Sequence, residues 1–210
     1  MIRVLIADDH LMVRRGLAQI IQDSAGMEVA AEAGDGREAL EQVAAKAVDV
    51  LILDIAMPGV GGLDVLHEMK RRHSEVKVIV LSMYPEEQYA IRSFRDGASA
   101  YLTKSSAPEE LIQAIRTVAA GKRYITPSVA DRLATFVEGA VPRPPHESLS
   151  SRELQVLVHI GSGKEVKEVA GVMKLSVKTV STYRSRILAK MGMRTTAQLI
   201  RYAIEHSLAP

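Results

Sequence analysis

The chain has 210 residues, of which 25% are charged and 47% hydrophobic, and it contains no cysteine. This is globular composition with enough apolar side chains for a core, so a disordered or fibrous chain is excluded. Without cysteine there is no disulfide framework, thiol nucleophile or thiolate-bound metal. No apolar run approaches the ~18 residues of a membrane span, and Met1–Ala7 lacks the features of a signal peptide, so we expect a cytoplasmic protein.

The net charge of +2 hides an uneven distribution. Residues 1–121 hold 13 Lys and Arg against 18 Asp and Glu, residues 122–145 hold 4 against 2, and residues 146–210 hold 10 against 5. A basic segment after an acidic one is typical of a module that meets nucleic acid or another polyanion.

Residues 1–121 alternate between two apolar patterns. Short runs rich in β-branched residues predict strands at Arg3–Ala7, Glu28–Ala33, Val48–Leu53, Val76–Leu81 and Ala100–Leu102. Helical spacing predicts helices through Val13, Leu17, Ile20 and Ile21, through Ala39, Leu40, Val43 and Ala47, and through Leu111, Ile115 and Val118. This alternation predicts an α/β domain with a doubly wound, five-stranded parallel sheet.

The pattern changes after residue 121. Thr126 and Pro127 form a good helix start, and Ala130–Val137 has the composition of a short helix, whereas the proline-rich Val141–Pro145 does not. We therefore expect residues 122–145 to form a linker with a short helix.

Strand-like runs are missing from residues 146–210. Four helices are predicted to begin near Ser150, Glu165, Ser176 and Thr195, two of them with the spacing of a capping box. The second and third are separated by a tight turn, so a helix-turn-helix domain follows the α/β domain.

Three carboxylates, Asp8, Asp9 and Asp54, follow the first and third predicted strands, so we expect them to share one pocket if these two strands are neighbours in the sheet. Repulsion among them demands a cation, and oxygen ligands suit Mg²⁺. Lys104 and Ser82, at the ends of two further strands, could meet an incoming anion. Each residue also has an ordinary explanation, a helix cap or a surface polar group, but their joint placement favours a functional site.

The predicted third helix of the second domain has an apolar face and a polar stripe. The stripe contains Lys178, Ser181, Thr182 and Ser185, flanked by Arg184 and Arg186. Such a helix fits a DNA major groove, where hydroxyls contact bases and cations meet phosphates or guanine. Taken alone, the stripe is better explained as the solvated face of an amphipathic helix.

The first domain resembles the receiver domain of two-component response regulators, through the motifs Ala7–His10, Leu53–Gly62, Leu81–Ser82 and Tyr101–Lys104. The resemblance implies a flavodoxin-like fold in which Asp54 accepts a phosphoryl group from a sensor histidine kinase. It also implies these roles: Asp8, Asp9, Asp54 and the backbone carbonyl of Ala56 as ligands of Mg²⁺ or Mn²⁺, and Ser82, Tyr101 and Lys104 as the residues that sense the phosphoryl group.

The second domain resembles the LuxR-type helix-turn-helix of the NarL/FixJ class, through Leu149–Leu157, Lys167–Ala170 and Leu175–Tyr183. The resemblance implies that Lys178 and Thr179 contact the DNA backbone. It implies that the bases face Ser181, Thr182 and Ser185.

We therefore predict a transcription regulator, not an enzyme, with a receiver at residues 1–121, a linker at 122–145 and a DNA-binding domain at 146–210. Phosphorylation would make it a dimer on an inverted-repeat operator, where it would meet RNA polymerase. One alternative is a regulator whose receiver works without phosphorylation. Another is a haloacid-dehalogenase-like phosphatase, which is disfavoured because Ala56 stands where that family has a second Asp.

Overall fold

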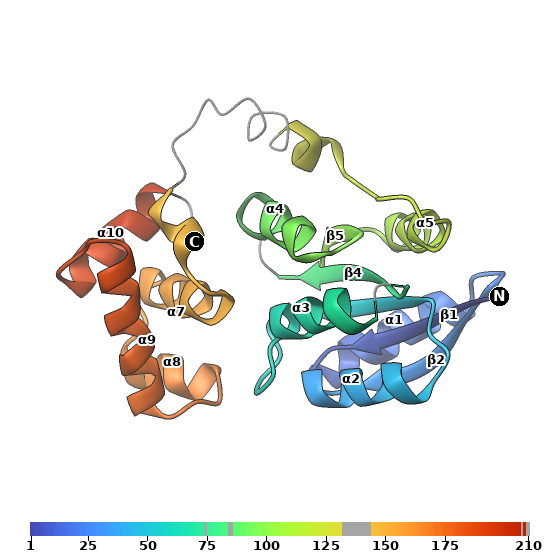
Figure 1. Cartoon of the computed structure of the whole chain (residues 1–210), viewed down its shortest axis with the longest axis horizontal. Helices are drawn as coiled ribbons and strands as arrows, with labels where there is room; N and C mark the ends of the chain where they lie inside the picture. The colour runs from blue at the N-terminus through green and yellow to red at the C-terminus, as the bar shows by residue number, and fades with distance from the viewer. Residues whose placement is uncertain (74, 84–85, 132–143, 207, 209–210) are drawn as a thin grey trace. The chain divides into compact units, whose positions relative to one another are not determined.

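The computed structural model describes residues 1–73, 75–83, 86–131, 144–206 and 208. Contacts between residues divide the chain into two compact units, Met1–Ala140 and Val141–Pro210 (Figure 1). Among the described residues, no helix has both the length and the apolar character needed to cross a membrane.

The first unit is built on a five-stranded parallel sheet, as predicted, and its strands lie in the order β2-β1-β3-β4-β5. The strands are β1 (Ile2–Ala7), β2 (Met27–Ala33), β3 (Val50–Asp54), β4 (Lys77–Ser82) and β5 (Ala100–Thr103). Every residue of β3 is buried, which explains its continuous apolar run: a central strand of a doubly wound sheet has no solvent face.

Helices follow the strands, and Figure 1 shows them on both faces of the sheet. They are α1 (Leu11–Gln22), α2 (Gly36–Ala45), α3 (Gly62–Arg72), α4 (Glu86–Asp96) and α5 (Pro108–Ala119). The predicted stripes of α1 and α5 supply Leu17, Ile21, Leu111, Ile115 and Val118 to one core with the sheet.

The prediction for the second helix is wrong at Ala47, because α2 ends at Ala45 and Lys46 is already extended. The chain leaves the helix early to place β3 beside β1. There the backbone N–H of Asp49 donates to the carbonyl of Arg3, and the Asp49 carboxylate accepts from the Arg3 backbone and guanidinium at 2.7–3.0 Å.

Beyond α5, residues 127–131 are helical. Thr126 begins this turn as predicted, since its carbonyl accepts from the backbone of Ala130 at 3.0 Å. The rest of the helix predicted for Ala130–Val137 lies outside the described residues.

The second unit contains the four predicted helices. They are α7 (Ser151–Gly161), α8 (Val166–Val172), α9 (Val177–Lys190) and α10 (Thr196–Glu205), preceded by a short 3-10 helix, η1 (Pro145–Ser148). Their N-caps are the four residues expected from the sequence, Ser150, Glu165, Ser176 and Thr195. The packing core is formed by Leu154, Leu157, Val180, Ile187 and Leu199, all buried.

Candidate functional site

The carboxyl ends of four adjacent strands bring polar side chains together in the first unit. Asp8 follows β1, Asp54 ends β3, Ser82 ends β4, and Lys104 follows β5. Asp8 and Asp54 are each 1% exposed, and Ser82 is fully buried. The backbone N–H of Lys104 donates to the carbonyl of Ser82 at 2.8 Å, so the ends of β4 and β5 are held in register.

Lys104 is the cation of this pocket. Its Nζ lies 2.7 Å from Oδ2 of Asp54 and 2.6 Å from Oδ2 of Asp8, and its side chain is 7% exposed. Burial raises the pKa of Asp54 above the ordinary value, although Lys104 and the N–H of Ala56 oppose the rise. Burial alone would lower the pKa of Lys104, but Asp54 and Asp8 outweigh it and raise that pKa.

The same pocket can hold a metal ion. Asp8, Asp9, His10 and Asp54 each offer one ligand atom, and these atoms lie within 4.8 Å of one another. Carboxylate oxygens are the ligands that Mg²⁺ prefers. Nδ1 of His10 is 3.2 Å from Oδ1 of Asp8 and 3.0 Å from Oδ1 of Asp9, and the imidazole is mostly exposed, so it lies at the rim.

Local backbone structure fixes the two deeply buried carboxylates. The N–H of His10 donates to Oδ1 of Asp8 at 2.8 Å, and Nη1 of Arg14 donates to the Asp8 carbonyl at 2.6 Å. At β3, Ala56 donates its N–H to Oδ1 of Asp54 at 2.9 Å. Gly62 lets α3 begin against this strand end, because a Cβ there would overlap the Asp54 carbonyl and lie 2.7 Å from Cα of Ile55.

Tyr101, predicted as a switch residue, lies on β5 opposite Val80 and is 1% exposed. Ala56 is exposed, in the turn after β3. The structure thus brings Asp8, Asp9, Asp54 and Lys104 into one cluster and places Ser82 and Tyr101 on the two strands beside it.

In the second unit, α8 and α9 are joined by a tight turn. Lys174 takes a left-handed conformation there (φ 53°), and the N–H of Leu175 donates to the Ala170 carbonyl at 2.9 Å. Ser176 then begins α9 by accepting from the N–H of Thr179 at 3.0 Å. This is the helix, turn and helix predicted from the sequence.

The predicted polar stripe lies opposite the buried face of α9, which Val180 and Ile187 form. Of the seven residues predicted to contact DNA, four are exposed and three partly buried: Lys178, Thr182, Ser185 and Arg186, then Thr179, Ser181 and Arg184. The hydroxyls of Thr182 and Ser185 donate to carbonyls one helical turn earlier, at 3.0 Å. Their oxygen lone pairs and the threonine methyl remain available to a ligand.

Sequence reasoning missed one ion pair that shapes this unit. Glu153 is the capping-box partner of Ser150, and its Oε2 also accepts from Nζ of Lys190 at 2.6 Å. The pair joins the start of α7 to the end of α9. No local pattern connects two residues 37 positions apart, so the sequence held no signal for it.

Each unit matches a known domain family. Residues 4–116 match the response regulator receiver domain, and residues 147–203 match the luxR family of bacterial regulatory proteins. The chain therefore belongs to the response regulators of the NarL/FixJ class, in which a receiver is joined to a LuxR-type helix-turn-helix domain.

Particular relatives cover nearly its whole length. It is 39% identical to response regulator UvrY of Escherichia coli O6:H1 over 209 residues, 99% of this chain and 96% of UvrY. It is 36% identical to response regulator GacA of Pseudomonas aeruginosa over 211 residues, 99% of this chain and 98% of GacA. A solved structure of RcsB from Salmonella enterica serovar Typhimurium, bound to promoter P1flhDC in the presence of phosphomimetic BeF3⁻, has a TM-score of 0.64 and 26% identity. That likeness covers 96% of this chain and 97% of RcsB.

Proposed function

We propose that a sensor histidine kinase phosphorylates Asp54 in a receiver at residues 1–121, and that this controls DNA binding by residues 146–210 through a linker at 122–145. The observation that carries the proposal is the buried Asp54 carboxylate, 2.7 Å from Nζ of Lys104 in a cluster with Asp8. The chain then acts as a phosphoacceptor protein that assists its own phosphorylation, and not as an enzyme with a separate substrate.

The pocket supports phosphoryl transfer by placing positive charge beside the Asp54 carboxylate. One carboxylate oxygen of Asp54 forms a bond to phosphorus as the phosphorus–nitrogen bond of the kinase phosphohistidine breaks. Nζ of Lys104 stays within reach of the new phosphoryl oxygens. Mg²⁺ or Mn²⁺, held by Asp8, Asp9, Asp54 and the Ala56 carbonyl, would supply the remaining neutralising charge.

The signal passes along β4 and β5. A phosphoryl group on Asp54 adds acceptor oxygens beside Ser82, whose hydroxyl turns to donate to them, and the ring of Tyr101 occupies the space this leaves. In this structure the Tyr101 ring is already buried on β5, opposite Val80 of β4.

The second unit supports DNA binding through α9. We assign Lys178, Thr179, Arg184 and Arg186 to phosphates or guanine, and Ser181, Thr182 and Ser185 to base edges. One such helix reads only a few base pairs, so the phosphorylated chain binds an inverted repeat as a dimer and recruits RNA polymerase there. The solved structure of the RcsB relative bound to a promoter supports DNA binding.

The test is to sequence genomic DNA fragments retained by the purified chain, with and without a small phosphodonor and Mg²⁺. We expect an inverted repeat that is enriched only after phosphorylation, and no such gain for Asp54→Asn. Equal enrichment in both states would favour the phosphate-independent regulator. Continuous release of phosphate from small phosphomonoesters, beyond one equivalent, would instead indicate a phosphatase.

A further inference from the structure

The chain that leaves α5 returns to the open edge of the sheet. Gly121, with φ +81°, ends the helix, and its N–H donates to the Val118 carbonyl at 2.9 Å. Tyr124 then forms a parallel bridge with Ala100 of β5, and its N–H donates to the Ser99 carbonyl at 3.0 Å. Figure 1 shows this segment passing the β5 edge and ending in a helical turn beyond it.

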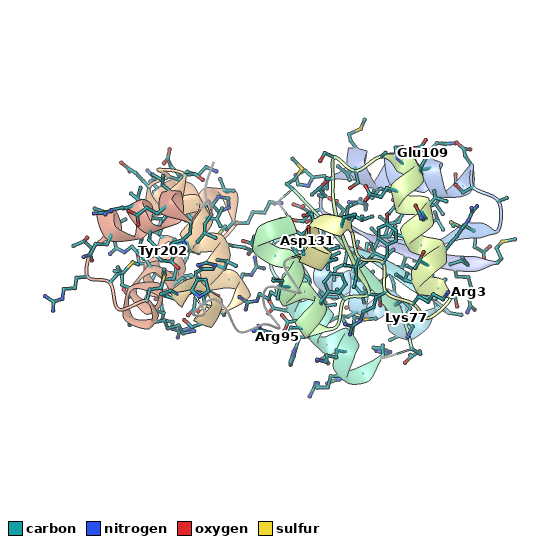
Figure 2. All side chains as sticks on the ribbon, turned by 90° about the horizontal axis from the view of Figure 1, so that it is seen from above. Arg3, Lys77, Arg95, Glu109, Asp131 and Tyr202 are labelled. Atoms are coloured by element: carbon teal, nitrogen blue, oxygen red, sulfur yellow. The ribbon has the colours of Figure 1, made fainter. Side chains whose placement is uncertain are left out.

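Two side chains fix this segment, residues 122–131, which we call the strap. Tyr124 packs against the core shared by the sheet, α1 and α5. Val129, in the helical turn, is 1% exposed although its neighbours Ser128 and Ala130 are exposed. An edge strand otherwise presents unpaired N–H and carbonyl groups to solvent, and the Tyr124 N–H pairs with one carbonyl at this edge. The strap therefore gains a hydrogen bond there, and it buries Val129 and part of Tyr124. Figure 2 places Asp131, the last described residue of the strap, on the side of α4.

The strap meets β5 next to the proposed switch. Tyr101 follows the bridged residue Ala100, and it is buried even though β5 is the last strand of the sheet. The strap also leads directly into the segment that continues to the second unit. A change at Tyr101 is therefore one residue away from the attachment point of the outgoing chain.

We propose that the strap is the receiver's output element: it docks on β5 when Tyr101 is buried, and phosphorylation of Asp54 tightens this docking. This rests on the proposed function, because it takes Asp54 as the phosphoacceptor. Tyr124 and Val129 act as positioning residues, since they hold the strap and contact neither the phosphoryl group nor DNA. Coupling of this kind is reciprocal, so releasing the strap weakens binding of a phosphoryl mimic at the pocket.

Amide hydrogen exchange of the full chain tests whether phosphorylation tightens the docking of the strap. The Tyr124 N–H reports the docked strap directly, and the Lys104 N–H reports the pocket. On addition of beryllofluoride and Mg²⁺ we expect exchange at Tyr124 to slow by about tenfold. A response at Lys104 without one at Tyr124 would overturn the strap proposal alone. No response at Lys104 would count against the proposed phosphoacceptor function itself.

Matched variants test whether releasing the strap weakens binding of the phosphoryl mimic. Val129→Asp places a charge at the buried position and should release the strap, whereas Ala130→Asp adds the same charge at the exposed position beside it. We expect Val129→Asp to raise the beryllofluoride concentration needed for half-saturation by about threefold and Ala130→Asp to leave it unchanged. Equal beryllofluoride concentrations at half-saturation in the two variants would reject the coupling. Exchange at the Lys104 amide verifies that the pocket of each variant is folded.

Discussion

Asp54 carries a charge where burial disfavours it. Because its pKa is raised in the folded chain, folding takes up protons between the unfolded and the folded pKa, and the stability contributed by this group falls as pH rises through that window. Above that window the ionised carboxylate of Asp54 is therefore destabilising. We predict that Asp54→Asn raises the free energy of unfolding of the first unit by about 1 kcal/mol in urea titrations with chelator present.

The control for this effect is pH. The asparagine side chain does not titrate, so the gain should shrink as pH falls and should vanish below the unfolded value of roughly 3.9, where the wild-type carboxyl is protonated in both states. A gain that stays constant from neutral to acidic pH would show that burial of the Asp54 charge is not its cause.

Gly62 allows the start of α3 to pack closely against the end of β3 at the same site. A methyl group there would overlap the Asp54 carbonyl, so Gly62→Ala must push α3 away from the end of β3. We predict lower stability and at least about tenfold slower phosphorylation by a small phosphodonor, measured by intact mass. Gly16→Ala is the matched control: nothing lies within 4 Å of a Cβ at Gly16 in α1, so the same change should stabilise by roughly 0.5–1 kcal/mol. Equal phosphorylation rates in the two variants would contradict this account.

Between elements, the Glu153–Lys190 pair fixes how α7 meets α9. Burial acts to raise the pKa of Glu153, but Lys190 and the Ser150 backbone outweigh it and hold that pKa below its usual range. The stability this carboxylate contributes is therefore complete above its unfolded value, near roughly 4.3, and is lost as pH falls through the folded value. We predict that Glu153→Gln destabilises the second unit by about 1–2 kcal/mol at pH 7, measured by thermal melting.

The exposed pair Arg201–Glu205 on α10 provides the comparison, since its Nε–Oε1 distance is also 2.6 Å. Solvent screens that pair, so Glu205→Gln should leave the melting midpoint unchanged. The deficit of Glu153→Gln should disappear in strong acid. A deficit that persists there would indicate lost packing instead of a lost charge.

Elements differ in how far their sequence predicts them. The four caps of the second unit and the five strands could be predicted because each depends on a few neighbouring residues. The end of α2 could not, because the helical spacing continues to Ala47, and the Asp49–Arg3 contact that follows the helix joins residues 46 positions apart. The position of the strap could not be predicted for the same reason, because nothing near Tyr124 indicates that it pairs with Ala100 at the edge of the sheet.

Across the whole molecule, the grouping of charged side chains at the candidate site could be predicted together with the parallel sheet. Side chains that follow parallel strands must gather at one edge, so Asp8, Asp9, Asp54 and Lys104 could be grouped before the structure was known. The Lys104–Asp8 ion pair was not foreseen, because the side-chain reach that selects between two carboxylates depends on the packing of every strand between them.

The division of charge between the two units makes DNA binding depend on salt. Each Lys or Arg that neutralises a phosphate should contribute about 0.9 to the slope of log affinity against log salt concentration. On the recovered operator, we predict that Lys178→Ala lowers the steepness of this slope by the contribution of one phosphate contact, about 0.9. Thr182→Ala should leave the slope unchanged and reduce discrimination against altered base pairs. Lys46→Ala, in the receiver, should change neither quantity. If Lys178→Ala and Lys46→Ala gave the same slope, α9 would not lie against the phosphates in the way its exposed face indicates.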